Sequence, residues 1–134
     1  MVQFTGKFTR VSAENYDEFL KALNVGFILR KAATASTPVM EITESDGNWS
    51  MKTSTSMKSM ELKFKLGEPF EEETSDGRKC TTTVTMEGNK LITDQKAIKK
   101  GEKDVRAVRE FFDDKLIISM TCDGVTSTQV YKRD

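Results

Sequence analysis

The sequence predicts a mainly β fold, an antiparallel barrel with a pair of helices over its mouth. Short segments of alternating apolar and polar residues follow one another, separated by turn signals such as Asp46-Gly47 and Asp123-Gly124. A single helical region lies near the start of the chain. Successive short antiparallel strands lose their exposed edges best by closing into a barrel, and one compact helix pair is suited to cap it.

The helical region is expected over about residues 15–36. Asn15 is a suitable N-cap, and Glu18 three residues later would complete a capping-box-like pair. A second short helix is expected from about Phe27 to Ser36, before Pro38. In the first helix one apolar face repeats at the helical spacing, through Tyr16, Phe19, Leu20 and Leu23.

The remaining chain reads as strands without a linker or repeat, so we expect a single domain over residues 1–134. Many threonines lie within these strands, which a hydrated barrel interior tolerates better than a tightly packed sandwich. Periodicity alone leaves a β-sandwich with an added helical hairpin open. The clearest strand candidates are Val39–Thr43, Trp49–Thr55, Met60–Leu66, Cys80–Met86, Val105–Phe111, Lys115–Thr121 and Val125–Tyr131.

The composition argues against several classes of function. The 134 residues carry 21 basic and 21 acidic side chains, so no electrostatic footprint for nucleic acid is present. No apolar run is long enough for a signal peptide or a membrane span, which predicts a cytoplasmic protein with Cys80 and Cys122 reduced. The chain has no histidine and no P-loop, zinc or dinucleotide motif. We therefore expect no enzyme, no metal and no cofactor.

Several short motifs occur in order along the whole chain: Gly6-Lys7-Phe8, 15–20, 24–27, 64–68, 71–79, 108–110, 123–125 and 131–133. Together they make the sequence resemble the intracellular lipid-binding proteins, and within them the fatty-acid-binding proteins. The resemblance implies a flattened, lipocalin-like (calycin) up-and-down barrel of about ten strands with a helix-turn-helix lid. It also implies a monomer that binds one long-chain fatty acid or similar lipid. One departure is Arg10, where the family usually has an aliphatic residue; we interpret it as a local change in the first strand.

The resemblance further implies a carboxylate site of two arginines and a tyrosine on the last strands. Arg109 and Tyr131 match this pattern, and Gln129 replaces the second arginine. Alternation independently places Gln129 and Tyr131 on one face, and Arg109 on a face with the apolar Ala107 and Phe111. From alternation alone, a flipped strand with Arg109 on the surface remains open.

The resemblance and position also imply a cavity and a portal near the second helix. The predicted cavity lining includes Tyr16, Phe19, Leu20, Leu23, Pro38, Ile118 and Met120. The predicted portal includes Val25, Leu29, Ala33, Met57, Lys58, Ser75 and Asp76. The family often has phenylalanine where Met57 stands, and Met57 is alternatively an ordinary exposed turn residue.

Other functions stay open at this stage. Retinol binders of this fold have glutamines in place of both arginines, and retinoic acid is itself a carboxylate, so a retinoid carrier is the main alternative. An enzyme would depend on a cysteine without a histidine base, and an interaction module would leave the barrel empty. Transient contact of the lid with anionic bilayers is the remaining partner hypothesis, resting on a basic patch of Lys21, Arg30, Lys31 and Lys58; a solvated helix face is its alternative.

Overall fold

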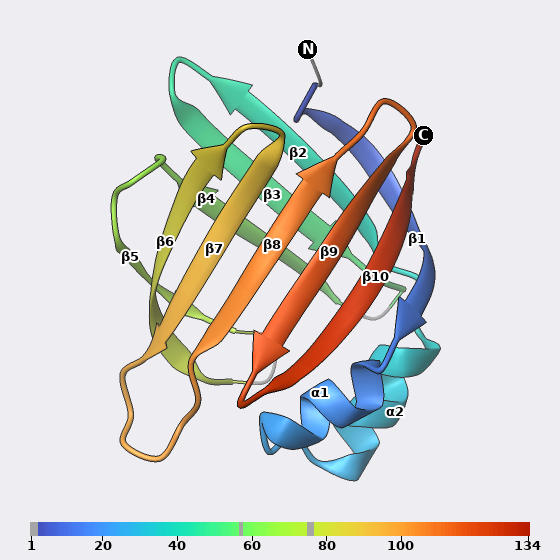
Figure 1. The fold of residues 1–134 in the computed structure, drawn as a ribbon, viewed down its shortest axis with the longest axis vertical. Coiled ribbons are helices and arrows are strands. Elements are labelled where there is room, and N and C mark those ends of the chain that lie inside the picture. The colour runs from blue at the N-terminus through green and yellow to red at the C-terminus, as the bar shows by residue number, and fades with distance from the viewer. Residues whose placement is uncertain (1–2, 57, 75–76) are drawn as a thin grey trace.

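The computed structural model describes residues 3–56, 58–74 and 77–134. Two helices follow the first strand, and nine further strands complete the chain (Figure 1). The elements are β1 (Gly6–Glu14), α1 (Tyr16–Ala22), α2 (Phe27–Ala35), β2 (Val39–Ser45), β3 (Asn48–Ser54), β4 (Ser59–Phe64), β5 (Phe70–Glu73), β6 (Lys79–Glu87), β7 (Lys90–Ala97), β8 (Val105–Phe111), β9 (Lys115–Cys122) and β10 (Val125–Arg133).

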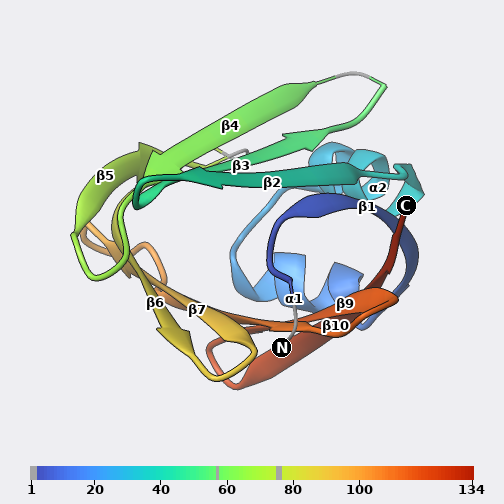
Figure 2. The ribbon, with the colours of Figure 1, turned by 90° about the horizontal axis from the view of Figure 1, so that it is seen from above.

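All ten strands belong to one antiparallel sheet in the order β4-β3-β2-β1-β10-β9-β8-β7-β6-β5. The first strand pairs with the last, so the sheet curls into a nearly closed barrel whose two free ends are β4 and β5. Seen along the barrel, α1 and α2 lie across the far opening (Figure 2). The predicted ten-stranded barrel with a helix-turn-helix lid is confirmed, and the β-sandwich alternative is wrong.

The tight turns explain the strand register. Two-residue connections join β2 to β3 and β9 to β10. Asp46 and Gly47 have φ of 53° and 83°, and Asp123 and Gly124 have φ of 53° and 80°. Positive φ at both central residues is typical of the type I′ turn, whose twist matches that of antiparallel strands. The Asp-Gly signals in the sequence therefore mark hairpins.

The start of α1 differs from the prediction. Asn15 is the N-cap residue of α1, as predicted, but it has a left-handed backbone with φ of 59° and its side chain makes no capping hydrogen bond, so the predicted capping box is wrong. A left-handed residue cannot direct its side chain as an extended N-cap residue does. The Asn15 Nδ2 instead donates to the Thr126 carbonyl oxygen at 3.0 Å. This hydrogen bond attaches the start of α1 to β10.

The two helices differ in how much of their side-chain surface is buried. On α1 the side chains of Phe19 and Leu20 are buried, whereas α2 buries none of its residues. Phe27, Ile28 and Leu29 at the start of α2 expose 62%, 81% and 54% of their surface. The second helix is thus the loosely packed part of the lid, with an apolar first turn directed outward.

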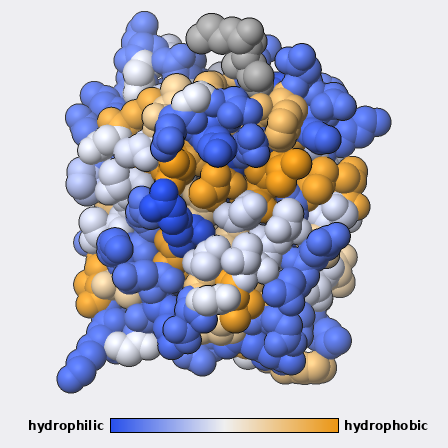
Figure 3. All heavy atoms as spheres, in the orientation of Figure 1, coloured by the Kyte–Doolittle hydropathy of each residue, from blue (hydrophilic) through white to orange (hydrophobic). Residues whose placement is uncertain are grey.

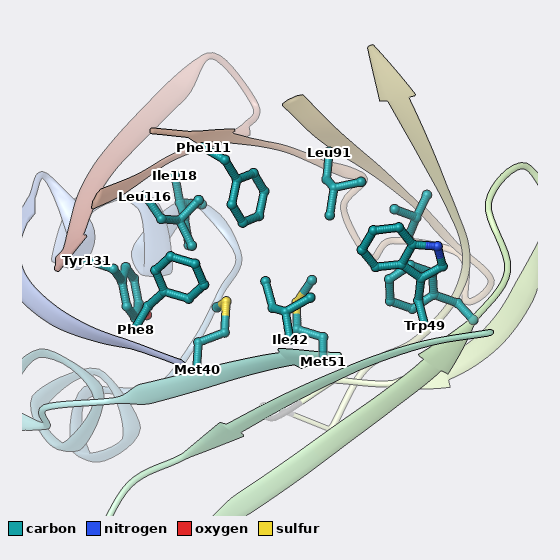
Figure 4. Packing of buried hydrophobic residues seen from close by; sticks show 12 residues of the cluster. Phe8, Met40, Ile42, Trp49, Met51, Leu91, Phe111, Leu116, Ile118 and Tyr131 are labelled. Atoms are coloured by element: carbon teal, nitrogen blue, oxygen red, sulfur yellow. The ribbon is translucent and has the colours of Figure 1, made fainter. Parts of the chain in front are cut away.

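Apolar side chains of opposite walls meet inside the barrel. Figure 4 shows Met40, Ile42 and Met51 of β2 and β3 directed toward Phe111 and Leu91 of β8 and β7. The outer face is not uniformly polar either. Hydrophobic atoms gather over the β6–β10 wall in Figure 3. In this wall Ile92 of β7 is the cross-strand partner of Val108 of β8.

Candidate ligand-binding site

Arg109 lies on the inward face of β8. It shares this face with the buried Val105, Ala107 and Phe111, so the flipped-strand alternative is wrong. Its Nη1 donates to the Thr93 Oγ1 on β7 at 3.1 Å. Its Nε is buried and has no hydrogen-bond partner among the described residues. A buried cationic donor without an acceptor is costly, so this position is suited to receive an anion.

The charged groups near Arg109 offset only part of the cost of burying its positive charge. Burial lowers the pKa of its guanidinium, while the charges of Tyr131 and Glu72 act in the opposite direction. Glu72 is itself buried. Its Oε1 already accepts hydrogen bonds from Thr82 Oγ1 at 2.6 Å and from Gln95 Nε2 at 2.8 Å. None of the ion pairs among the described residues involves Arg109.

Gln129 and Tyr131 lie beside Arg109 on the same inner wall. Both are 3% exposed. Ile118 on β9 is the cross-strand partner of Arg109 on one side and of Gln129 on the other. The Tyr131 hydroxyl approaches the Gln129 Oε1 at 3.5 Å, the long limit of a hydrogen bond. The three predicted head-group residues are therefore brought together by strand register.

Sequence reasoning missed the part that Arg10 plays here. Arg10 of β1 is the cross-strand partner of Tyr131, and it is 8% exposed. Its Nη1 donates to the Gln129 Oε1 at 3.4 Å, and its guanidinium lies 5.3 Å from the ring centre of Tyr16. The available signal was its spacing of two residues from Phe8, which places both side chains on the inward face of the strand. Arg10 thus adds a second guanidinium to the predicted site.

The predicted cavity residues divide into two groups. Phe19, Leu20, Leu23 and Val25 form a buried cluster with Val105 and Cys122 beneath the lid, against which Tyr16, Ala33 and Met120 pack. Ile118 belongs instead to the cluster inside the barrel. Pro38 is buried, and its carbonyl oxygen accepts from the Arg10 backbone N–H at 3.0 Å. These residues link the underside of the lid to the barrel interior.

Part of the predicted portal surrounds a hollow at the lid. This hollow has a volume of about 230 Å³ and is lined by Leu23, Asn24, Val25, Gly26, Leu29, Arg78, Gly101 and Glu102. Lys58 is exposed, and Ala33 of α2 is half-buried. The predicted portal residues Met57, Ser75 and Asp76 lie outside the described residues. Three of the predicted lid-side residues, Leu23, Val25 and Leu29, therefore lie at one opening.

A larger hollow of about 550 Å³ lies where β4 and β5 leave the sheet unclosed. Its lining is Asn48, Trp49, Ser50, Lys63, Phe64, Lys65, Glu68, Pro69 and Phe70. It contains none of the predicted site residues. The stacked rings of Trp49, Phe64 and Phe70 lie about 6 Å apart and form an apolar wall there. Volume alone does not identify a ligand-binding site.

The basic residues of the lid are partly neutralised. Asp17 contacts Arg30 at 3.0 Å and Lys21 at 3.5 Å, and Lys21 also contacts Glu18 at 3.2 Å. Desolvation raises the pKa of Asp17, but the hydrogen bond and charge of Arg30, together with Lys21, outweigh it and hold that pKa below its usual value. The basic patch therefore has less free charge than its residue count suggests.

The thiol of Cys122 is buried. Burial raises the pKa of the Cys122 thiol, which disfavours the nucleophilic thiolate. Within the described ranges, no group of three potential metal-ligating side chains occurs. No helix in the same part of the chain has the length and apolar character needed to cross a bilayer.

Comparison with known proteins identifies the family of the chain. Residues 5–134 match the model of the lipocalin / cytosolic fatty-acid binding protein family. The chain is 43% identical to a fatty acid-binding protein of Tyrophagus putrescentiae over 99% of both chains, and 41% identical to cellular retinoic acid-binding protein 2 of Mus musculus over 100% of both. A Schistosoma mansoni fatty acid binding protein solved with arachidonic acid superposes with a TM-score of 0.92 at 30% identity, covering 98% of this chain and 96% of that one. The chain therefore belongs to the lipocalin / cytosolic fatty-acid binding protein family.

Proposed function

We propose that this protein binds one long-chain fatty acid non-covalently and carries it through the cytosol as a monomer. The observation that carries the proposal is Arg109, a half-buried cation whose buried Nε lacks an acceptor and whose charge interacts with Tyr131. A carboxylate placed there accepts from Arg109 and from Tyr131, with Gln129 as an additional donor. Charge-assisted hydrogen bonds contribute about 1.5–3 kcal/mol each.

The acyl chain supplies most of the affinity in this proposal. Each methylene that leaves water gains roughly 0.8 kcal/mol, so a long chain gains more from burial than its head group gains from hydrogen bonds. The apolar side chains inside the barrel and beneath the lid are suited to receive it. The head group then fixes orientation and discriminates acids from esters and alcohols.

A retinoid carrier is the second candidate, and Gln129 is the observation that favours it. A neutral amide at this position weakens the preference for a full carboxylate pair, and one relative named above is a retinoic acid-binding protein. Titration of the purified protein with oleate, retinoic acid and retinol separates the candidates. Tight binding of oleate alone supports the fatty-acid function, and a clear preference for either retinoid overturns it.

Identification of the natural ligand is the direct test. Native mass spectrometry and organic extraction of the freshly purified protein should yield a stoichiometric long-chain acid. Preparations that contain no lipid and do not bind palmitate would favour an interaction module instead. Turnover of a bound ester or acyl thioester would contradict the carrier function, in which no covalent step occurs.

We also propose that α2 contacts bilayers during transfer. The exposed Phe27, Ile28 and Leu29 form an apolar first turn, and Lys31 lies 5.4 Å from the centre of the Phe27 ring. An apolar turn flanked by a basic side chain is suited to the interface of an anionic membrane. Because Arg30 and Lys21 are engaged with Asp17, the apolar residues carry most of this contact.

A further inference from the structure

Arg10 is a buried cation with only neutral partners. Its side chain lies inside the barrel opposite Tyr131, with 8% of the residue exposed. Its guanidinium donates to Gln129 Oε1, to the Ala33 carbonyl oxygen and to the Ser36 carbonyl oxygen. Among the described residues, none of the ion pairs includes Arg10. A buried charge is normally paired with an opposite one, so this position lacks an anion.

Arg10 and Arg109 approach the same phenol from opposite sides. Burial raises the pKa of Tyr131, and the charges of Arg10 and Arg109 both act to lower it. Tyr131 lies on β10, Arg10 on the neighbouring β1, and Arg109 two strands away on β8. In strand order Tyr131 therefore lies between Arg10 and Arg109, and the charges of both act on its hydroxyl.

The same guanidinium also contacts the end of the lid. Arg10 Nη2 lies 3.2 Å from the Ala33 carbonyl oxygen and 2.8 Å from that of Ser36, at the C-terminal end of α2. Carbonyl oxygens at a helix C-terminus attract a cation, since they have no partner within the helix. With no buried residue of its own, α2 depends strongly on such polar attachments.

We propose that Arg10 is a second head-group ligand, shared between the fatty-acid carboxylate and the C-terminal end of α2. The inference rests on the proposed function. When a carboxylate occupies the space between Arg109 and Tyr131, it competes with the Ala33 and Ser36 carbonyl oxygens for Arg10. An anion is the stronger acceptor, so its arrival weakens the attachment of α2. A ligand without charge leaves that attachment intact.

The first test compares an acid with its neutral analogues. Arg10→Met preserves much of the side-chain volume and removes the charge. We expect it to weaken palmitate binding about tenfold, the scale of one charge-assisted bond, in titration calorimetry. Binding of methyl palmitate should be unchanged or tighter. Equal affinity of wild type and Arg10→Met for palmitate overturns the proposal.

Two further variants keep the test decisive. If Arg10→Met does not fold, Arg10→Lys retains the charge but lacks the planar guanidinium fork that fixes the direction of the donors, and it should show a smaller selective loss for palmitate. Arg109→Gln, measured on the same ligands, separates the two hypotheses. A loss with Arg109→Gln and none with Arg10→Met contradicts only the role of Arg10. Failure of the wild type to bind palmitate contradicts the proposed function, and this inference with it.

Hydrogen exchange tests the link to the lid. The amides of residues 34–37 should exchange several-fold faster with palmitate bound than with hexadecanol bound, because only the acid engages Arg10. In Arg10→Met the two ligands should give equal exchange in this segment. Equal exchange with the two ligands in the wild type would show that the head group does not compete with α2 for Arg10.

Discussion

Arg109 and Gln129 share a single cross-strand partner, Ile118, so they face the barrel interior on two strands separated by one. Their backbones are therefore about 10 Å apart, two strand spacings. Side chains of this length can reach one small group between them. This relationship explains why residues twenty positions apart in the sequence act as one candidate site.

The simplest prediction concerns Arg109. Arg109→Gln should weaken palmitate binding roughly ten- to a hundredfold, because one charge-assisted bond is lost. Methyl palmitate should bind equally well or better once the buried charge is gone. Titration calorimetry with both ligands measures the difference. Arg106→Gln is the matched control, since Arg106 lies on the same strand but is exposed and contacts Asp94 at 3.5 Å. Equal losses for acid and ester would place the head group elsewhere.

A second prediction concerns the glutamine that replaces the family's second arginine. Gln129→Arg should lower the free energy of unfolding by about 2–4 kcal/mol, because Arg10 loses its amide acceptor and faces a like charge. Arg10→Leu combined with Gln129→Arg should recover most of that loss. Urea denaturation of the wild type, both single variants and the double variant gives the coupling energy. Additive losses would show that the two side chains are independent.

The pH dependence of stability provides a third prediction. Burial raises the pKa of Tyr131 above its usual value of 10.0, against the opposing charges of Arg10 and Arg109 and with a small contribution from Tyr16. The unfolded phenol therefore loses its proton first as the pH rises, and the unfolded state binds fewer protons. The stabilisation is complete below about pH 10 and is lost at higher pH.

Tyr131→Phe removes this titration. Above about pH 10 the free energy of unfolding should fall less steeply in Tyr131→Phe than in the wild type. Urea denaturation at several pH values between neutral and strongly alkaline conditions measures both slopes. The lysines are the same in both proteins, so the difference between the slopes gives the contribution of Tyr131. Parallel slopes throughout this range would contradict a raised pKa.

The sequence predicted the elements whose residues alternate cleanly. The candidate strand 105–111 coincides with β8, and the helical region near residues 15–36 contains α1 and α2. It did not identify β5 or β7 as clear candidates. Most of β5 is a run of glutamates, and in β7 the adjacent Leu91 and Ile92 are both buried, so neither shows a period of two. Pairing with longer neighbours determines these two strands.

The candidate site was predictable only in part. Arg109, Gln129 and Tyr131 could be placed on inward faces by alternation and by family resemblance. Arg10 was interpreted as a local change, because its significance depends on two relationships that are distant in sequence. One is its pairing with Tyr131 across the junction of the first and last strands, and the other is its contact with the end of α2. Barrel closure creates both, and no local pattern encodes them.

The last prediction concerns the lid surface. Phe27→Ser combined with Ile28→Ser should slow transfer of a fluorescent fatty acid to anionic vesicles about tenfold, because apolar contact with the bilayer is lost. Met86→Ser is the matched control, since Met86 is also exposed but lies on the β6–β7 hairpin, away from the helices (Figure 1). Lys31→Glu should slow transfer to anionic vesicles more than to neutral ones. Wild-type transfer should accelerate with vesicle concentration, as expected when collision precedes release. A transfer rate that does not depend on vesicle concentration or charge would show that the ligand leaves through water without contact between α2 and the bilayer.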